Sequence, residues 1–359
     1  MNPDPDKTRT ANRYETGDLP AIEEHDLPQG RHQFHKERLM SQIHDDRRAA
    51  AETRASAGRA RNPFLRKSIL LPAATALAGA LAVGVLVLTP GGGVDPVDRA
   101  TGPALTTTIG VADAKGAPRL LDRISLAAAA AEAPHGRAGQ YIYIETRSAN
   151  TYVRTVDGES SLVSDPLHTR QSWRSPDGLK GWLIEPGNTG PEGLTLEGRD
   201  EQGNVPKSHL GAPSHDYLAT LPTDPDALLR KIYEETEGQG RGKDQQAFTT
   251  IGDLLGESWP TPKLTAALYR AAAKIPGVVM VDSATDAAGR KGVAVARLDE
   301  TSGERTEWIF DSKTFTFLGE RTVQVKGNSG EGGLIKPGTV VYTHAIMVRA
   351  FVDDIKVVP

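Results

Sequence analysis

Two short runs bring together the residue types of serine-hydrolase chemistry. Ser208 is followed by His209, and Ser214 is followed by His215 and Asp216. A hydroxyl nucleophile, an imidazole base and a carboxylate act together only when the fold brings them together, and chain neighbours seldom point at one another. The sequence has no G-x-S-x-G nucleophile elbow. Both runs fall in a polar segment, 187–215, that we expect to form a loop, so we predict that neither is catalytic.

A glycine-rich stretch is the second candidate. Gly238, Gly240 and Gly242 alternate with other residues, and Lys243 follows. Such a loop binds phosphates through its backbone N–H groups when it follows a strand and begins a helix. Here it follows a predicted helix, so we interpret it, like the run 327–333, as a flexible connector.

Metal and cofactor chemistry finds little support. The chain contains no Cys, which excludes disulfides, thiolate zinc sites, iron–sulfur clusters and a cysteine nucleophile. His32, His35 and His44 are scattered along a polar arm and are interpreted as surface residues. The carboxylate pairs have no diagnostic spacing. We therefore predict no catalytic, cofactor-binding or metal-binding residues, and a protein that is not an enzyme.

Composition and charge further limit the functional classes to which the protein can belong. The 359 residues carry 42 Lys+Arg and 46 Asp+Glu, a net charge of −4, which argues against a nucleic-acid binder. Hydrophobic residues make up only 38% of the chain, yet residues 69–89 are apolar and carry no charge. At about 1.5 Å per residue this segment would span about 31 Å, the thickness of a bilayer core. We predict a transmembrane helix rather than a buried core helix.

The flanks of this segment indicate its orientation. Between 47 and 67 there are seven basic residues and only Glu52 as an acid, whereas the other side begins with glycines and aspartates. The positive-inside rule then places the N-terminus in the cytoplasm and the C-terminal domain outside. The basic block could also contact anionic lipid head groups. Ala76, Ala80 and Gly84 form a small-residue row that could let two such helices pair.

The cytoplasmic arm divides into two parts. Residues 1–30 are polar and are predicted to be disordered. Residues 31–68 are predicted to form a juxtamembrane helix, whose part 31–61 could dock in a cytoplasmic regulator or remain solvated. Residues 90–118, rich in Gly, Pro, Thr and Asp, are predicted to be a linker.

The outer domain, 119–359, has helices and strands in separate blocks. We predict a helix over 119–134, strands over 140–147 and 151–156 with a turn at Asn150, and three helices between 223 and 274. The first of these three should begin at Asp224, whose side chain can cap a helix, with Pro225 at the first helical position. An antiparallel meander should follow over 278–325, with a final strand over 340–350. Segregated elements of this kind indicate an α+β fold with a curved antiparallel sheet packed on helices.

One hairpin carries two tryptophans. Trp173 and Trp182 flank the turn Ser175-Pro176-Asp177-Gly178, which has Pro and Gly where the backbone needs them. The two rings could line a recognition surface, but we expect them to pack in the core.

Several stretches together resemble an uncharacterised family of single-pass membrane proteins from actinobacteria. The matching motifs are a GR-x-GVAVA strand (Gly289, Arg290, 292–296), an IFD-x-x-T turn (309–311, Thr314), LGER (318–321) and W-x-S-x-DG (173–178). The resemblance covers most of 31–359. Members of this family are often encoded beside extracytoplasmic-function sigma factors, so the resemblance implies such a gene neighbourhood here. It implies no catalytic residue.

These observations predict a membrane-anchored signalling or accessory protein whose outer domain binds a ligand or partner, with a possible link to sigma-factor regulation. The alternatives are a structural envelope protein that contacts wall or membrane components and, third, an extracytoplasmic enzyme.

Overall fold

A computed structural model describes residues 101–156, 158–200 and 203–359. The predictions for the disordered segment 1–30, the juxtamembrane helix 31–68, the membrane helix 69–89 and the first part of the linker lie outside these residues. Among the residues that are described, no helix has both the length and the apolar character to cross a bilayer.

Antiparallel strands dominate the described part of the chain. One sheet has the order β2-β8-β9-β10-β11-β12-β3-β5-β6-β7, and β4 pairs with both β3 and β1. The strand bounds are β1 Gly102–Pro103, β2 Ala112–Asp113, β3 Tyr141–Val156, β4 Glu159–Ser164, β5 His168–Arg174, β6 Lys180–Ile184, β7 Leu194–Glu197, β8 Val278–Thr285, β9 Lys291–Asp299, β10 Glu304–Phe310, β11 Phe317–Gln324 and β12 Val340–Val352.

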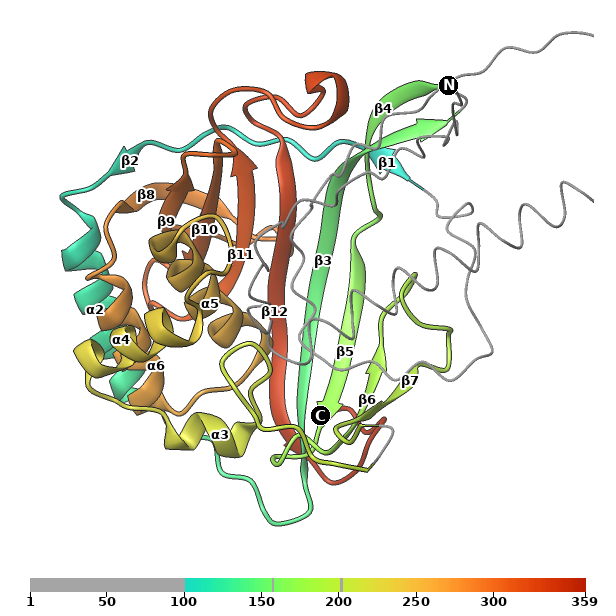
Figure 1. Cartoon of the computed structure of the whole chain (residues 1–359), viewed down its shortest axis with the longest axis vertical. Helices are drawn as coiled ribbons and strands as arrows, with labels where there is room; N and C mark the ends of the chain where they lie inside the picture. Colours follow the sequence, from blue (N-terminus) through green and yellow to red (C-terminus); the bar gives the residue numbers. More distant parts are fainter. Residues whose placement is uncertain (1–100, 157, 201–202) are drawn as a thin grey trace, which may run out of the picture. The chain divides into compact units, whose positions relative to one another are not determined.

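The helices gather on one face of the sheet, over strands β8 to β11 (Figure 1). They are α2 Ala117–Ala130, α3 His215–Thr220, α4 Pro225–Glu235, α5 Lys243–Glu257 and α6 Pro262–Ala272, with a short 3-10 turn, η3, at Glu331–Gly333. The predicted start of α4 is confirmed: the Asp224 side chain accepts a hydrogen bond from the Ala227 N–H, and Pro225 follows it. Thr261 and Pro262 begin α6 in the same way.

The main core lies between these helices and the sheet. Alternate residues of β10 point into it, among them Trp308 and Phe310, which are fully buried. The Trp308 ring stacks on Phe248 of α5 with 3.8 Å between ring centroids. The predicted α+β class, with a large antiparallel sheet packed with helices, is confirmed.

Three segments differ from the sequence-based prediction. Asn150 was expected to form a turn, but β3 continues through it because its backbone pairs with Tyr342 and its amide donates to Asp165. The expected loop 187–215 contains β7 and the start of α3. The described part of the predicted linker is not free, since β1 pairs with β4 and β2 pairs with β8.

The last residues of the chain cover the opposite face of the sheet near β3, β5 and β6. Trp173 is 1% exposed and donates from Nε1 to the Val357 carbonyl at 2.7 Å. Lys356 lies over the Trp182 ring, 4.1 Å from its centroid. The hairpin that carries the two tryptophans is confirmed, and Trp173 packs in a small second core with Tyr143 and Val352.

Candidate functional site

A row of polar side chains crosses the helix-covered face of the sheet. Residues that lie directly opposite one another on neighbouring antiparallel strands share a face. The pairs Trp308–Glu320, Glu320–His344, His344–Ser148 and Ser148–His168 connect β10, β11, β12, β3 and β5 in turn. We call these five residues the inner row. Most neighbouring positions in a sheet core are apolar, so this row is a candidate for binding.

Two glycines let α5 lie close over the inner row. A Cβ atom at Gly252 would lie 2.6 Å from Trp308 Nε1 and 3.0 Å from Glu320 Oε2. A Cβ atom at Gly256, one turn later, would lie 3.0 Å from Cε1 of His344. The four-residue spacing puts both glycines on one side of α5, so this side of the helix rests on polar rings and a carboxylate rather than on aliphatic side chains.

The C-terminal end of α5 is held by two arginines from the sheet. Arg349 of β12 donates to the carbonyls of Leu255 and Gly256. Arg170 of β5 pairs with Glu257 at 3.2 Å. Cations are favourable there because the last carbonyls of a helix carry partial negative charge.

The pair Arg170–Glu257 extends into a wider polar network. Arg170 lies 3.5 Å from Glu185, the residue that follows β6, and Glu185 lies 3.8 Å from His168 Nε2. His168 Nε2 is also 3.3 Å from the Ser148 hydroxyl. Charged and polar groups thus connect α5 to β5, to β3 and to the residue after β6.

Several buried polar nitrogens around the inner row have no hydrogen-bond partner. Trp308 Nε1, both ring nitrogens of His344 and Nε of Arg349 find no hydrogen-bond partner among the described residues. His344 is 3% exposed. A buried polar group without a partner costs free energy, typically about 1–3 kcal/mol, and such groups are frequent where a protein recognises something else.

Burial shifts the protonation equilibria of this region. It raises the pKa of Glu320 to about 7, and the Glu257 carboxylate adds to that shift. Burial, reinforced by Glu320 and Glu257, also raises the pKa of Asp253 well above its usual range. Burial lowers the pKa of His344 to about 4. Between about pH 4 and pH 7 the region thus favours the neutral forms of both Glu320 and His344.

For His168 and Glu185, by contrast, ion pairing shifts the pKa values toward the charged forms. Contact with Glu185 raises the pKa of His168. Burial alone would raise the pKa of Glu185, but His168 and Arg170 lower it overall. These two partners therefore favour their charged forms.

The space beside this cluster is small. A cavity of about 30 Å³ lies between α5 and β5. It has room for one or two water molecules, since one water needs about 10–15 Å³. Its lining is Arg170, Ser172, Arg174, Leu210, Pro213, Asp253, Leu254, Glu257 and Ser258. Small-molecule pockets are commonly about 300–1,000 Å³, so a sizeable ligand would require α5 or the loop at 210–213 to move.

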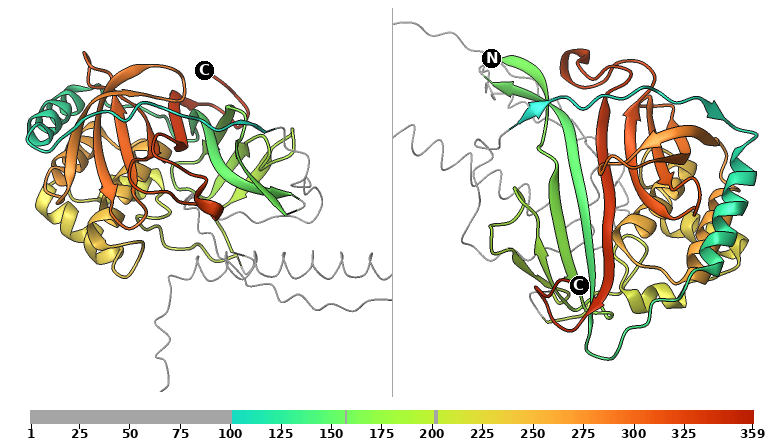
Figure 2. Two further views of the ribbon diagram at one scale, coloured as in Figure 1. Left: turned by 90° about the horizontal axis from the view of Figure 1, so that it is seen from above. Right: turned by 180° about the vertical axis from the view of Figure 1, so that it is seen from behind.

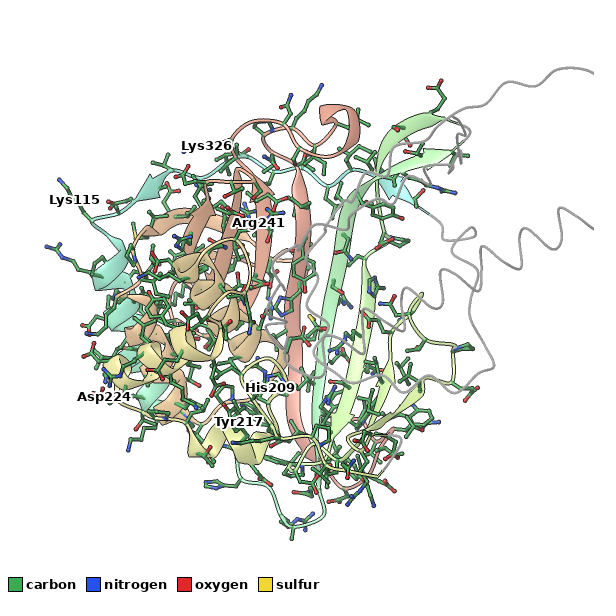
Figure 3. All side chains as sticks on the ribbon, viewed as in Figure 1. Lys115, His209, Tyr217, Asp224, Arg241 and Lys326 are labelled. Atoms are coloured by element: carbon green, nitrogen blue, oxygen red, sulfur yellow. The ribbon has the colours of Figure 1, made fainter. Side chains whose placement is uncertain are left out.

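The hydrolase-like runs are placed apart from the inner row. His209 and Tyr217 are seen near α3 in Figure 3. Ser214 caps α3 by accepting a hydrogen bond from the Tyr217 N–H at 3.1 Å. His215 packs edge-on against the Phe351 ring at 6.0 Å between centroids, and its Nδ1 has no partner in the described chain. Ser214, His215 and Asp216 therefore begin a helix.

The glycine-rich stretch lies at the N-terminus of α5. Gly242 precedes the helix with a φ of 123°, so the stretch does begin a helix, although it follows α4 and not a strand. Its cations already have partners: Arg241 pairs with Asp299 at 3.1 Å, and Lys243 lies over the Tyr233 ring. An open depression of about 180 Å³ lies beside it.

Sequence reasoning missed the grouping of Ser148, His168 and Glu185. The three residues are far apart in the chain and meet only through strand register. In a catalytic triad the carboxylate contacts the ring nitrogen that faces away from serine. Here Ser148 and Glu185 both approach Nε2, and Nδ1 lies 3.1 Å from the Pro166 carbonyl. The geometry is that of a polar network and not of a nucleophilic site.

The described part of the chain contains no group of three His, Cys, Asp or Glu side chains arranged to hold a metal ion. In comparisons with known proteins, no protein-family model and no curated protein matches this chain.

Proposed function

We propose that this protein is a membrane-anchored signalling or accessory protein whose outer domain binds a ligand or partner. In this proposal residues 69–89 cross the membrane once, the basic block at 47–67 keeps the N-terminus in the cytoplasm, and residues 31–61 contact a cytoplasmic regulator. The resemblance to actinobacterial single-pass proteins supports a role beside sigma-factor regulation. The outer domain acts by binding, without catalysis, cofactor or nucleic acid.

The observation that carries the binding role is the set of unpartnered buried donors at the inner row. Trp308, His344 and Arg349 present N–H groups between α5 and the sheet. Burying such groups without hydrogen bonds costs free energy, which apolar side chains at the same positions would avoid. A bound molecule or peptide that carries acceptor oxygens would satisfy these donors, so we infer that acceptor-rich ligands are preferred.

A second function has one observation in its favour. The enclosed cavity holds about 30 Å³, which suits a structural envelope protein that contacts wall or membrane components through its surface. Such a protein would need no opening between α5 and the sheet.

Native mass spectrometry of the full chain, extracted from membranes in mild detergent, tests the binding role. We expect a bound molecule or partner that is retained by the parent protein and by Thr316→Ala, an exposed position. Trp308→Phe, which removes one inner-row donor, should retain at least about tenfold less of it. If Trp308→Phe retains the bound species as well as Thr316→Ala does, or if the parent protein carries none, the result would favour the structural envelope role.

A further inference from the structure

The segment 101–113, which we call the strap, lies across the face of the sheet opposite the helices (Figure 2). Besides its short pairings at β1 and β2, its middle is fixed by two backbone hydrogen bonds. Val340 donates to the Leu105 carbonyl at 2.8 Å, and Thr107 donates to the Gly338 carbonyl at 2.8 Å. None of residues 101–113 is fully buried.

Beneath the strap lies a buried cluster of three charges. Glu307 is 0% exposed and contacts Arg305 Nη2 through Oε1 at 2.6 Å and Arg321 Nε through Oε2 at 2.8 Å. Arg305 and Arg321 are also buried. Two guanidinium groups therefore share one carboxylate, and one positive charge stays uncompensated within the triad. A buried charge of this kind is costly unless further acceptors solvate it.

The strap supplies two of those acceptors. Arg305 donates to the Gly110 carbonyl at 3.1 Å, and Arg321 donates to the Thr107 hydroxyl at 3.1 Å. Two of the apolar strap residues contribute little burial, because Ile109 is 37% and Val111 is 73% exposed. The strap is thus held by a few polar contacts, which is typical of segments that open without global unfolding.

The triad and the inner row occupy adjacent residues on opposite faces of two strands. Glu307 precedes Trp308 on β10, and Arg321 follows Glu320 on β11. Consecutive strand residues point to opposite faces. A shift of β10 or β11 at the inner row therefore moves the groups that bind the strap.

We propose that the strap is a releasable latch, fastened by the Arg305–Glu307–Arg321 triad, that opens while the domain stays folded and responds to the inner row. Opening lets water reach the uncompensated guanidinium charge, which offsets the lost contacts. The latch itself does not depend on the binding role. Its response to the inner row rests on the proposed function, because it would pass a binding event toward the segment that precedes the strap.

Hydrogen exchange measured by mass spectrometry on the full chain in detergent tests the latch. Gly110→Ala should push the strap away from β8, because a Cβ atom there would lie 2.6 Å from Val281 Cγ1 and 2.9 Å from the Ser283 carbonyl oxygen. We expect strap amides to exchange at least about tenfold faster, while amides of β10 and β11 keep their protection. Gly190→Ala is the matched control, because its Cβ atom would meet nothing within 4 Å.

Thr107→Val is a second variant, which removes the strap's acceptor for Arg321 and leaves the triad intact. It should raise strap exchange by about tenfold. Unchanged strap exchange in both variants, or strap exchange that rises only together with that of β10 and β11, would overturn the latch.

Trp308→Phe tests the link to the inner row. It should change strap exchange by at least about threefold, because a smaller ring at position 308 lets β10 shift and moves the neighbouring Glu307 on the other face. If Gly110→Ala opens the strap but Trp308→Phe leaves its exchange unchanged, the latch stands and its link to the inner row is wrong. Loss of bound species in mass spectrometry is a separate readout, so failure of the binding role remains distinguishable.

Discussion

At the inner row, the carboxyl group of Glu320 lies among groups that disfavour its ionised form. Burial and the nearby Glu257 carboxylate raise its pKa to about 7. Between about pH 4.5 and 7 the folded protein therefore holds a proton that the unfolded chain has released. Stability supplied by this group is complete below the unfolded pKa and is lost as pH rises through the folded pKa.

Glu320→Gln should remove this pH dependence. We expect the parent protein to lose thermal stability relative to the variant between about pH 4.5 and 7, measured as the difference between their unfolding midpoints. His344, whose pKa is lowered to about 4 by burial, contributes an opposite slope that is common to both proteins. Glu300→Gln is the control, because Glu300 is exposed and forms a surface ion pair with Lys326. Parallel pH profiles for parent and Glu320→Gln would contradict the assignment.

For single residues, the sequence predicted local roles such as helix capping better than it predicted which residues meet in space. Asp224 and Pro225 were predicted as a helix start because capping depends on local spacing. The same signal at Ser214 was overlooked because its neighbours suggested catalysis. The inner row was not predicted, since Glu320, His344, Ser148 and His168 meet through strand register, which sequence distance does not reveal.

The helix α5 is the element that makes the site. Its apolar residues, such as Phe248 and Ile251, pack in the core, while Gly252 and Gly256 rest on the inner row. The sequence predicted a helix in this part of the chain. Its glycines carried no visible signal, because a glycine in a helix shows its purpose only when the neighbour it makes room for is known.

Gly252→Ala should destabilise the domain. Alanine favours a helix by about 1 kcal/mol over glycine, but the added Cβ atom would lie 2.6 Å from Trp308 Nε1. Overpacking of this kind costs about 1–3 kcal/mol. We expect the net effect to lower the free energy of unfolding in urea by about 1 kcal/mol, whereas Gly190→Ala changes it little. A variant as stable as the parent would show that α5 does not lie against the inner row.

The strap shows how an element can be misjudged from composition. Residues 101–113 are rich in Gly, Thr and Ala and lack an apolar pattern, which predicts a linker. Their attachment depends on Arg305 and Arg321, which lie about 200 residues later and reach the strap from β10 and β11. Contacts made by backbone carbonyls leave no trace in the sequence of the segment that provides them.

Over the whole molecule, the order of elements was sufficient to predict the class of fold. Hairpin turns with glycine at positive φ, such as Gly178, Gly289 and Gly303, marked the meander and the tryptophan hairpin. The long pairing of β12 with β3 closes the sheet between distant parts of the chain. It was not predicted, because long-range pairing is set by packing rather than by local propensity.

The central claim is that one membrane segment displays this domain outside the cell. The chain has no Cys, so a single introduced cysteine reports on one position without background. Ser56→Cys lies in the basic arm, and Ser312→Cys lies in an exposed turn between β10 and β11. In intact cells, a membrane-impermeant maleimide should label position 312 and should reach position 56 only after the membrane is permeabilised. Labelling of position 56 in intact cells, or protection of position 312, would contradict the account.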